Sequence, residues 1–145
     1  ISDDHSFGMV GRFEWEASAG WFPNNKFVPF MNWTHFNTSR VHITSSGVGR
    51  FMALPYYSAS TNQYYVQAHA EQHFNGFILN KIPLIKKLKW QIVGGVHYLY
   101  EPTFGNYWEV TAGIENIFQI IRVDFVAPFR ERDVQQFAFR FQLGF

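Results

Sequence analysis

Two groups of residues have the types and the spacing that could support chemistry. Glu14 and Glu16 place two carboxylates two positions apart, and His69, Glu71 and His73 place two imidazoles and a carboxylate at the same spacing. Paired carboxylates can serve acid–base catalysis when they share an enclosed pocket. Imidazoles and carboxylates can bind Zn²⁺ when they converge on one ion.

The spacing of these residues does not favour either kind of chemistry. Alternate residues of a β-strand point to the same face and lie about 7 Å apart, so one strand arranges them in a row. A row does not surround a metal ion. We therefore expect these residues to be polar groups lining a hydrated interior, and we predict no catalytic residue, metal site or cofactor.

A third polar group lies in the last third of the chain. Arg122 and Asp124 fall on one face of a predicted strand, and Arg140 falls on the corresponding face of the last one. We predict that these three form an ion-pair network that sets strand register or the shape of the interior. The alternative is that each is hydrated separately. The predicted polar lining comprises Arg122, Asp124, Arg140, Glu115, His69, Glu71 and His73.

The elements that must position these residues are strands, because apolar residues recur at every second position. In residues 120–129, for example, Ile121, Val123 and Phe125 alternate with Arg122 and Asp124. The same alternation predicts strands over residues 11–21, 50–57, 63–77, 90–100, 107–115, 120–129 and 135–145. Charged residues recur on one face and large apolar residues on the other, as in a transmembrane barrel with a polar interior.

Two stretches do not follow this alternation. Residues 22–49 could form a structured loop or an additional hairpin that contains an eighth strand. Residues 77–89 combine apolar residues near helical spacing with a cluster of lysines. This second stretch could be a connector at a membrane surface or an ordinary amphipathic turn.

The final residues, QQFAFRFQLGF, show the alternation most clearly. The apolar positions are Phe137, Phe139, Phe141, Leu143 and Phe145. This pattern resembles the C-terminal assembly signal of bacterial outer-membrane barrels, which commonly end on an aromatic residue. The alternative is an edge strand of a soluble sandwich.

Aromatic residues near the ends of the predicted strands would suit the two interfaces of a membrane. Trp and Tyr gather in aromatic girdles where a barrel wall leaves the hydrocarbon region. The predicted interface residues are Trp21, Tyr57, Trp90, Tyr98, Tyr100 and Trp108.

Composition supports an all-β protein and excludes several other classes. Of the 145 residues, 20% are aromatic, yet the mean hydropathy is only −0.16, as expected when apolar and polar residues alternate. No run approaches the length of about 18 apolar residues that marks a membrane helix. The net charge of +1 argues against nucleic-acid binding, and the absence of cysteine excludes disulfides and cysteine-based sites. Because the chain starts at Ile1, we expect a removed signal peptide or a fragment of a longer chain.

From Phe51 onward the chain resembles a known family. The segments YYSASTNQYY, EQHFNGFILNKIPLIKKLKW, FGNYWEVTAGIENIF and IIRVDFVAPF look like the C-terminal barrel region of uncharacterised outer-membrane proteins from Bacteroidota. Members typically carry an N-terminal carboxypeptidase-like regulatory domain and a periplasmic middle region. The resemblance therefore implies that residues 1–145 are a barrel region at the C-terminal end of a longer chain.

The last two strands, RVDFVAPFRERDVQQFAFRFQLGF, are also similar to the end of the barrel-assembly insertase superfamily. Barrels of that superfamily have about sixteen strands. Its Arg-Gly-Phe motif does not occur as such in this chain. The fold expected is therefore an antiparallel transmembrane β-barrel, complete with about eight strands or the C-terminal half of a larger one.

These observations leave three hypotheses for function. The first is a non-catalytic membrane anchor or accessory component of a complex in the outer membrane of a Gram-negative bacterium. Its partners would be outer-membrane lipid, the barrel-assembly machinery and other outer-membrane proteins, with no nucleic acid. The second is the barrel of an insertase or translocation conduit, and the third is a soluble β-sandwich binding module.

Overall fold

The computed structural model describes residues 1–23, 28–38, 43–44, 48–74, 76, 88–130, 133–134 and 137–143. Seven strands of five residues or more build one sheet in this part of the chain. They are β1 (Ser2–Ser6), β2 (Arg12–Trp21), β4 (Tyr64–Phe74), β5 (Gln91–Glu101), β6 (Gly105–Ile117), β7 (Ile121–Arg130) and β9 (Ala138–Leu143). Two short strands, β3 (Ile43–Thr44) and β8 (Asp133–Val134), and two 3₁₀ turns, η1 (Gly8–Val10) and η2 (Phe30–Asn32), complete the described elements.

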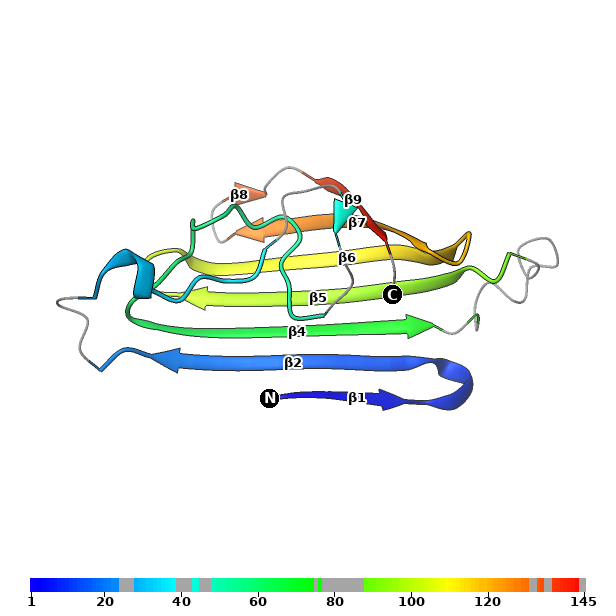
Figure 1. Cartoon of the computed structure of the whole chain (residues 1–145), viewed down its shortest axis with the longest axis horizontal. Helices are drawn as coiled ribbons and strands as arrows, with labels where there is room; N and C mark the ends of the chain where they lie inside the picture. The colour runs from blue at the N-terminus through cyan, green and yellow to red at the C-terminus, as the bar shows by residue number, and fades with distance from the viewer. Residues whose placement is uncertain are drawn as a thin grey trace.

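The seven longer strands follow one another across the sheet in chain order (Figure 1). Each pairs with its neighbour in antiparallel fashion, from β1 against β2 to β7 against β9. The short strand β3 lies parallel to β9, and β8 pairs with β7. Within the described residues the sheet is open, because its path begins at β1 and ends at β3.

The register gives the sheet two chemically different faces. One row across the strands reads Trp15, Ala70, Val96, Val110 and Ala127. The adjacent row reads Glu16, His69, His97, Glu109 and Pro128. Because neighbouring residues of a strand point to opposite faces, the apolar rows share one face and the polar rows share the other. We call these the outer face and the inner face.

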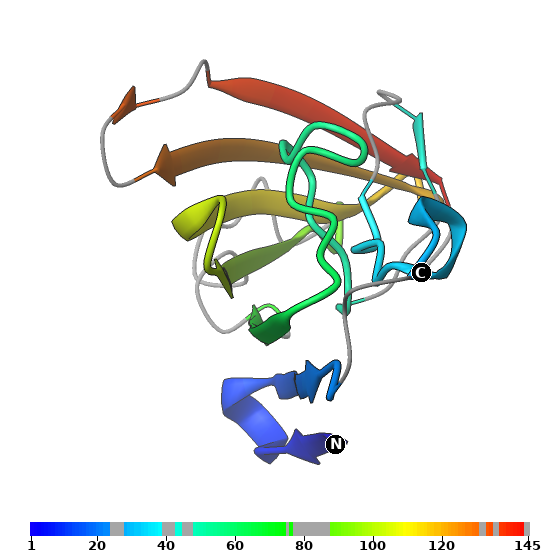
Figure 2. The same cartoon turned by 90° about the vertical axis from the view of Figure 1, so that its left-hand side faces the viewer.

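The sheet curves around the inner face, as Figure 2 shows in a view along the strands. Residues 48–61, which we call the inward segment, run through the hollow of this curve. Phe51, Leu54 and Ala59 of the inward segment form a buried apolar cluster with Leu99, Phe104 and Tyr107 of the sheet. The inner face is therefore covered by the chain itself.

Five of the predicted strands are confirmed with bounds within three residues, namely those that correspond to β2, β4, β5, β6 and β7. The predicted strand over residues 135–145 is described only as β9, and Phe145 lies outside the described residues. The all-β, antiparallel fold class is also confirmed. None of the helices in the described residues is long and apolar enough to cross a membrane.

The predicted strand over residues 50–57 is wrong. These residues alternate weakly, but the structure makes them part of the inward segment, with only an isolated bridge between Phe51 and Thr38. Backbone N–H groups of residues 52–54 donate to a carboxylate of the sheet instead of to a neighbouring strand. Conversely, β1 was not predicted, because its sequence SDDHS contains no apolar residue that could alternate.

The two stretches without alternation are only partly described. Of residues 22–49, the structure shows η2, the two residues of β3 and the bridge between Thr34 and Thr61. Of residues 77–89, it describes only Leu88 and Lys89, so the predicted membrane-surface connector lies outside the described residues.

Candidate functional site

Most of the buried polar residues lie on the inner face, and we call this set the inner polar layer. Adjacent residues of β6 show the contrast between the two faces: Glu109 is 0% exposed, whereas Val110 is 44% exposed. The inner polar layer comprises His69, Glu71, His73, His97, Glu101, Glu109, Thr111, Glu115, Arg122, Asp124, Arg140 and Gln142. All seven residues predicted to line the interior belong to it.

Arg122 of β7 is the centre of the layer. Its Nε donates to both carboxylate oxygens of Asp124 at 2.9 Å, and its Nη1 donates to Glu71 Oε2 at 2.9 Å. Gln142 of β9 adds a hydrogen bond from Nε2 to Asp124 Oδ2 at 2.8 Å. Because Glu71 belongs to β4, the Arg122–Glu71 contact passes over the two intervening strands, β5 and β6.

Two glycines make room for this bridge. A Cβ atom at Gly95 of β5 would lie 2.5 Å from Thr111 Oγ1 and 3.1 Å from Glu71 Cγ. A Cβ atom at Gly113 of β6 would lie 2.7 Å from the carbonyl oxygen of Val123 and still closer to Asp124. The distances to Thr111 Oγ1 and to the Val123 carbonyl oxygen are shorter than real Cβ contacts, so a larger residue at either position would force its neighbours to move.

The histidines of the layer form three further contacts. His73 lies with Nδ1 3.0 Å from Glu115 Oε2 and with Nε2 3.7 Å from Glu71 Oε2. His69 and His97 face each other with their Nδ1 atoms 3.0 Å apart. The ring of Phe51 packs over His69 at a centroid distance of 4.6 Å, so the inward segment covers the histidine pair.

Glu109 holds the inward segment against the sheet. Its Oε2 accepts from the backbone N–H of Met52 at 2.7 Å, and its Oε1 accepts from Ala53 at 2.8 Å and Leu54 at 2.9 Å. The hydroxyl of Tyr107 donates to the same Oε1 at 2.6 Å. One carboxylate therefore satisfies three successive backbone donors that have no strand partner.

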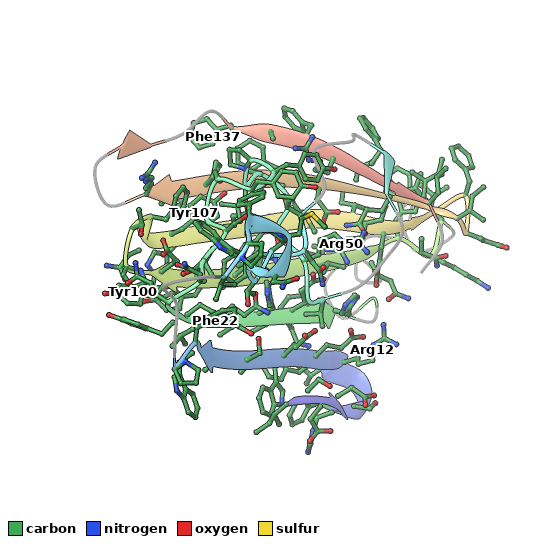
Figure 3. All side chains as sticks on the ribbon, turned by 60° about the vertical axis from the view of Figure 1, so that its left-hand side comes forward. Arg12, Phe22, Arg50, Tyr100, Tyr107 and Phe137 are labelled. Carbon is green, nitrogen blue, oxygen red and sulfur yellow. The ribbon has the colours of Figure 1, made fainter. Side chains whose placement is uncertain are left out.

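Arg140 of β9 makes a second attachment to the inward segment. Its Nε donates to the carbonyl oxygen of Met52 at 2.7 Å. Figure 3 shows side chains of the described residues filling the space between the sheet and this segment. Of the three residues predicted to form an ion-pair network, Arg122 binds Asp124 and, in addition, Glu71, while Arg140 donates to the inward segment.

The contacts of this layer connect strands of the sheet to one another and to the inward segment. The carboxylates and imidazoles of the layer are buried, and apart from Glu101, which accepts from the turn between β5 and β6, they contact other residues of the layer or the inward segment. Among the described residues, no group of three or more His, Cys, Asp or Glu could hold a metal ion. The geometry can fix the curvature of the sheet and the position of residues 48–61.

The outer face is apolar and exposed. Four of the five residues of the predicted assembly signal lie outside the inner layer and are 45–60% exposed, namely Phe137, Phe139, Phe141 and Leu143. A shallow apolar groove of about 500 Å³ crosses this face. The groove is lined by Ile92, Ala112, Gly113, Ile114, Ile117, Val123, Phe125 and Phe139.

The predicted interface aromatics are unevenly placed. Trp21, Tyr98, Tyr100 and Trp108 lie toward one end of the sheet, where Trp21 pairs with Tyr64 and the rings of Tyr98 and Trp108 are 4.3 Å apart. Trp90 lies at the opposite end, immediately before β5. Tyr57 belongs to no strand and contacts His35 and Phe30 beside the inward segment.

Sequence reasoning did not single out five residues of the layer: His97, Glu101, Glu109, Thr111 and Gln142. The alternation does place His97 and Glu109 on polar faces of their predicted strands, which is the signal that could have found them. Their partners could not be found in this way, because alternation within a strand does not give the register between strands.

Comparison with known proteins identifies a matching family model. A family model described as "Family of unknown function (DUF5686) C-terminal domain" matches residues 1–114. No curated protein and no solved structure matches the chain. The matched residues contain the inward segment and Glu109, whereas β7 and β9 lie beyond the match.

Proposed function

The chain belongs to the DUF5686 C-terminal domain family, whose function is unknown, and we propose that its sheet forms part of the wall of an outer-membrane β-barrel. In this proposal the outer face contacts lipid, and the inner polar layer with the inward segment fills the interior. The role is that of a membrane anchor or accessory component, without catalysis, in the outer membrane of a Gram-negative bacterium.

The observation that carries the proposal is the inverted placement of apolar and charged residues. In a water-soluble sheet the apolar face is covered and the charged face is wet. Here Glu71, Asp124 and Arg122 are 0–3% exposed, whereas Val96, Trp108 and Phe139 are 43–60% exposed. Contact with hydrocarbon would remove this apolar area from water, which is favourable at about 25 cal/mol per Å².

Strand length supports the same proposal. A strand needs about 9–11 residues to cross a bilayer at a tilt. The central strands β2, β4, β5, β6 and β7 contain 10–13 residues each.

We further propose that the barrel is larger than the sheet described. Exposed edges of a sheet leave backbone N–H and C=O groups without partners, which hydrocarbon cannot supply. The strand β1 is such an edge. Additional strands from a longer polypeptide would close a barrel of about sixteen strands, inserted by the barrel-assembly machinery through the aromatic β9 region.

Two valines offer a test with a matched control. Val66 and Val96 are both outward and both 43% exposed, but Val96 is in the middle of β5 whereas Val66 is near the start of β4. In a lipid-facing wall, a lysine near the bilayer midplane costs about 2–4 kcal/mol and one near the interface about 0–1 kcal/mol. We expect Val96→Lys to lower the heat stability of the detergent-purified protein strongly and Val66→Lys to lower it slightly.

The measurement is the temperature at which the folded, fast-migrating form converts to the unfolded form on a gel. If the outer face is wet, both lysines lie on a solvated surface and both variants keep the parental stability, which would contradict the proposal. Recovery of the parent protein from cells without detergent would support a soluble module instead.

A further inference from the structure

Five buried side-chain atoms of the inner polar layer have no hydrogen-bond partner among the described residues. They are His69 Nε2, Glu71 Oε1, His97 Nε2, Thr111 Oγ1 and Arg122 Nη2. Native proteins rarely leave buried polar atoms unpaired, because each one has given up its bonds to bulk water. Five in one layer therefore require an explanation.

Several of these atoms converge on one place in the fold. In the register across the sheet, Gly95 lies between Glu71 and Thr111. Thr111 Oγ1 and His97 Nε2 lie 2.5 and 3.3 Å from the position that a Cβ atom of Gly95 would occupy. The guanidinium that carries Arg122 Nη2 is bound to the carboxyl group that carries Glu71 Oε1. The Thr111 hydroxyl, the His97 ring and the Glu71–Arg122 pair carry four of the five unpaired atoms, all but His69 Nε2, and these groups thus cluster around Gly95.

We propose that this cluster is a binding site for one or more internal water molecules, which bridge Thr111 and His97 to the Glu71–Arg122 pair. Buried waters typically make about three hydrogen bonds to polar groups that would otherwise be unsatisfied. A water bonded at about 2.8 Å to each neighbour joins groups too far apart to bond directly. The distances around Gly95 place Thr111 Oγ1 and His97 Nε2 within that reach.

The mixture of donors and acceptors identifies water as the ligand. Arg122 Nη2 only donates, Glu71 Oε1 as a carboxylate oxygen only accepts, and the Thr111 hydroxyl does both. An anion near Arg122 would also meet the Glu71 carboxylate, and a cation near Glu71 would meet the guanidinium. Water, with two donors and two acceptors, satisfies all of these atoms at once.

The histidine pair fits the same ligand. Because the Nδ1 atoms of His69 and His97 share one hydrogen bond, one ring donates through Nδ1 and the other accepts. In the uncharged pair, one Nε2 is then an acceptor and the other is a donor. Water can bond to either, so the site does not depend on which tautomer is present.

The site has a structural consequence. The side-chain hydrogen bonds described above do not connect the His69–His97 pair to the network of Glu71, Arg122 and Asp124. Waters above Gly95 join the two into one hydrogen-bonded system that reaches from β4 to β9. This inference concerns the buried inner face and does not depend on what covers the outer face.

Replacement of Thr111 by the isosteric valine tests the proposal, because the two alternatives predict different effects on the midpoint temperature of unfolding. If the hydroxyl anchors water, Thr111→Val removes a satisfied group and lowers the midpoint temperature of unfolding. If the hydroxyl is dry and unpaired, the same change removes an unsatisfied buried polar group and raises the midpoint or leaves it unchanged. The full chain, folded in detergent or membrane, is used throughout.

Thr61→Val is the matched control. Thr61 is equally buried, and its Oγ1 accepts a hydrogen bond from the backbone N–H of Gln63 at 3.1 Å, so its replacement should lower the midpoint. A decrease for Thr111→Val comparable with that of Thr61→Val supports the water site. An unchanged or raised midpoint overturns it.

A crystal structure that resolves ordered solvent provides a second, independent measurement. We expect a water within hydrogen-bond distance of Thr111 Oγ1 and of at least one of His97 Nε2, Glu71 Oε1 and Arg122 Nη2. A structure in which these atoms bond directly to protein groups, with no water among them, overturns the proposal even if a variant fails to fold.

Discussion

At the scale of single residues, Arg122 shows how a charge is tolerated inside this fold. The side chain is 3% exposed, and it binds the carboxylates of Asp124 and Glu71 at the same time. Removing charges from water is costly, and only close geometry with additional hydrogen bonds offsets the cost. Arg122 meets this condition through three hydrogen bonds at 2.9 Å.

Charge reversal at Asp124 should therefore be severely destabilising. Asp124→Lys leaves Arg122 beside a second cation in a buried site, where breaking an ion pair costs about 3–5 kcal/mol. We expect a large loss of heat stability or of folded protein in the membrane fraction. Asp4→Lys, on the exposed strand β1, is the control and should be neutral. Equal stability of the two variants would show that Arg122 and Asp124 contribute no net stabilisation.

At the scale of elements, the inward segment depends on one carboxylate. Glu109 accepts from three successive backbone N–H groups, so it replaces the strand partner that residues 52–54 lack. Alternation in the sequence predicts a strand over residues 50–57, because nothing local distinguishes a segment that pairs with a strand from one that pairs with a side chain. The decisive residue lies more than fifty positions away.

Glu109→Gln should release the inward segment while the sheet stays folded. The amide nitrogen of glutamine donates and cannot accept, so at least one of the three backbone donors loses its partner. We expect faster tryptic cleavage after Arg50, measured by mass spectrometry of the fragments under native conditions.

Glu101→Gln is the matched control for that experiment. Glu101 is also buried, but it accepts from the backbone N–H groups of Thr103 and Phe104 in the turn between β5 and β6. Its replacement should leave cleavage after Arg50 unchanged. Similar cleavage of both variants and the parent would mean that Glu109 does not hold the segment.

At the scale of the whole molecule, the contact between Glu71 and Arg122 links strands that are not neighbours. It joins β4 to β7 over β5 and β6, where Gly95 and Gly113 leave room. The contact thus acts on the curvature of the sheet, whereas an ion pair within one strand, such as Arg12–Glu14, does not.

Two double-mutant cycles can compare the coupling free energies of these two ion pairs. We expect Glu71→Gln and Arg122→Met to show a coupling free energy of about 2–3 kcal/mol, within the range for residues in direct contact. Arg12→Met and Glu14→Gln, on a more exposed pair, should couple by less than about 1 kcal/mol. Equal coupling in the two cycles would argue against a special role for the bridge across the sheet.

The whole sheet also shows which features of the structure can be predicted from the sequence and which cannot. Of the seven strands that alternation predicts, five match the structure closely, and the polar faces predicted for them contain buried charges such as Glu71, Arg122 and Asp124, because the period of two is a local property. Alternation does not predict that Arg122 meets Glu71 or that Glu109 meets residues 52–54, because these contacts depend on register and curvature. It also misses β1, whose polar residues pair through the backbone alone.

The wide sequence separation of the buried contacts has a consequence for the order of folding. His73 and Glu115 are 42 residues apart, Glu71 and Arg122 are 51 apart, and Met52 and Glu109 are 57 apart. Until β6 and β7 are in place, Glu71 and His73 are without these partners, and burying them alone is unfavourable. Non-local contacts of this kind form slowly. The interior should therefore close late and in a single cooperative step, with the chain kept in a hydrated, chaperone-accessible form until its last strands arrive.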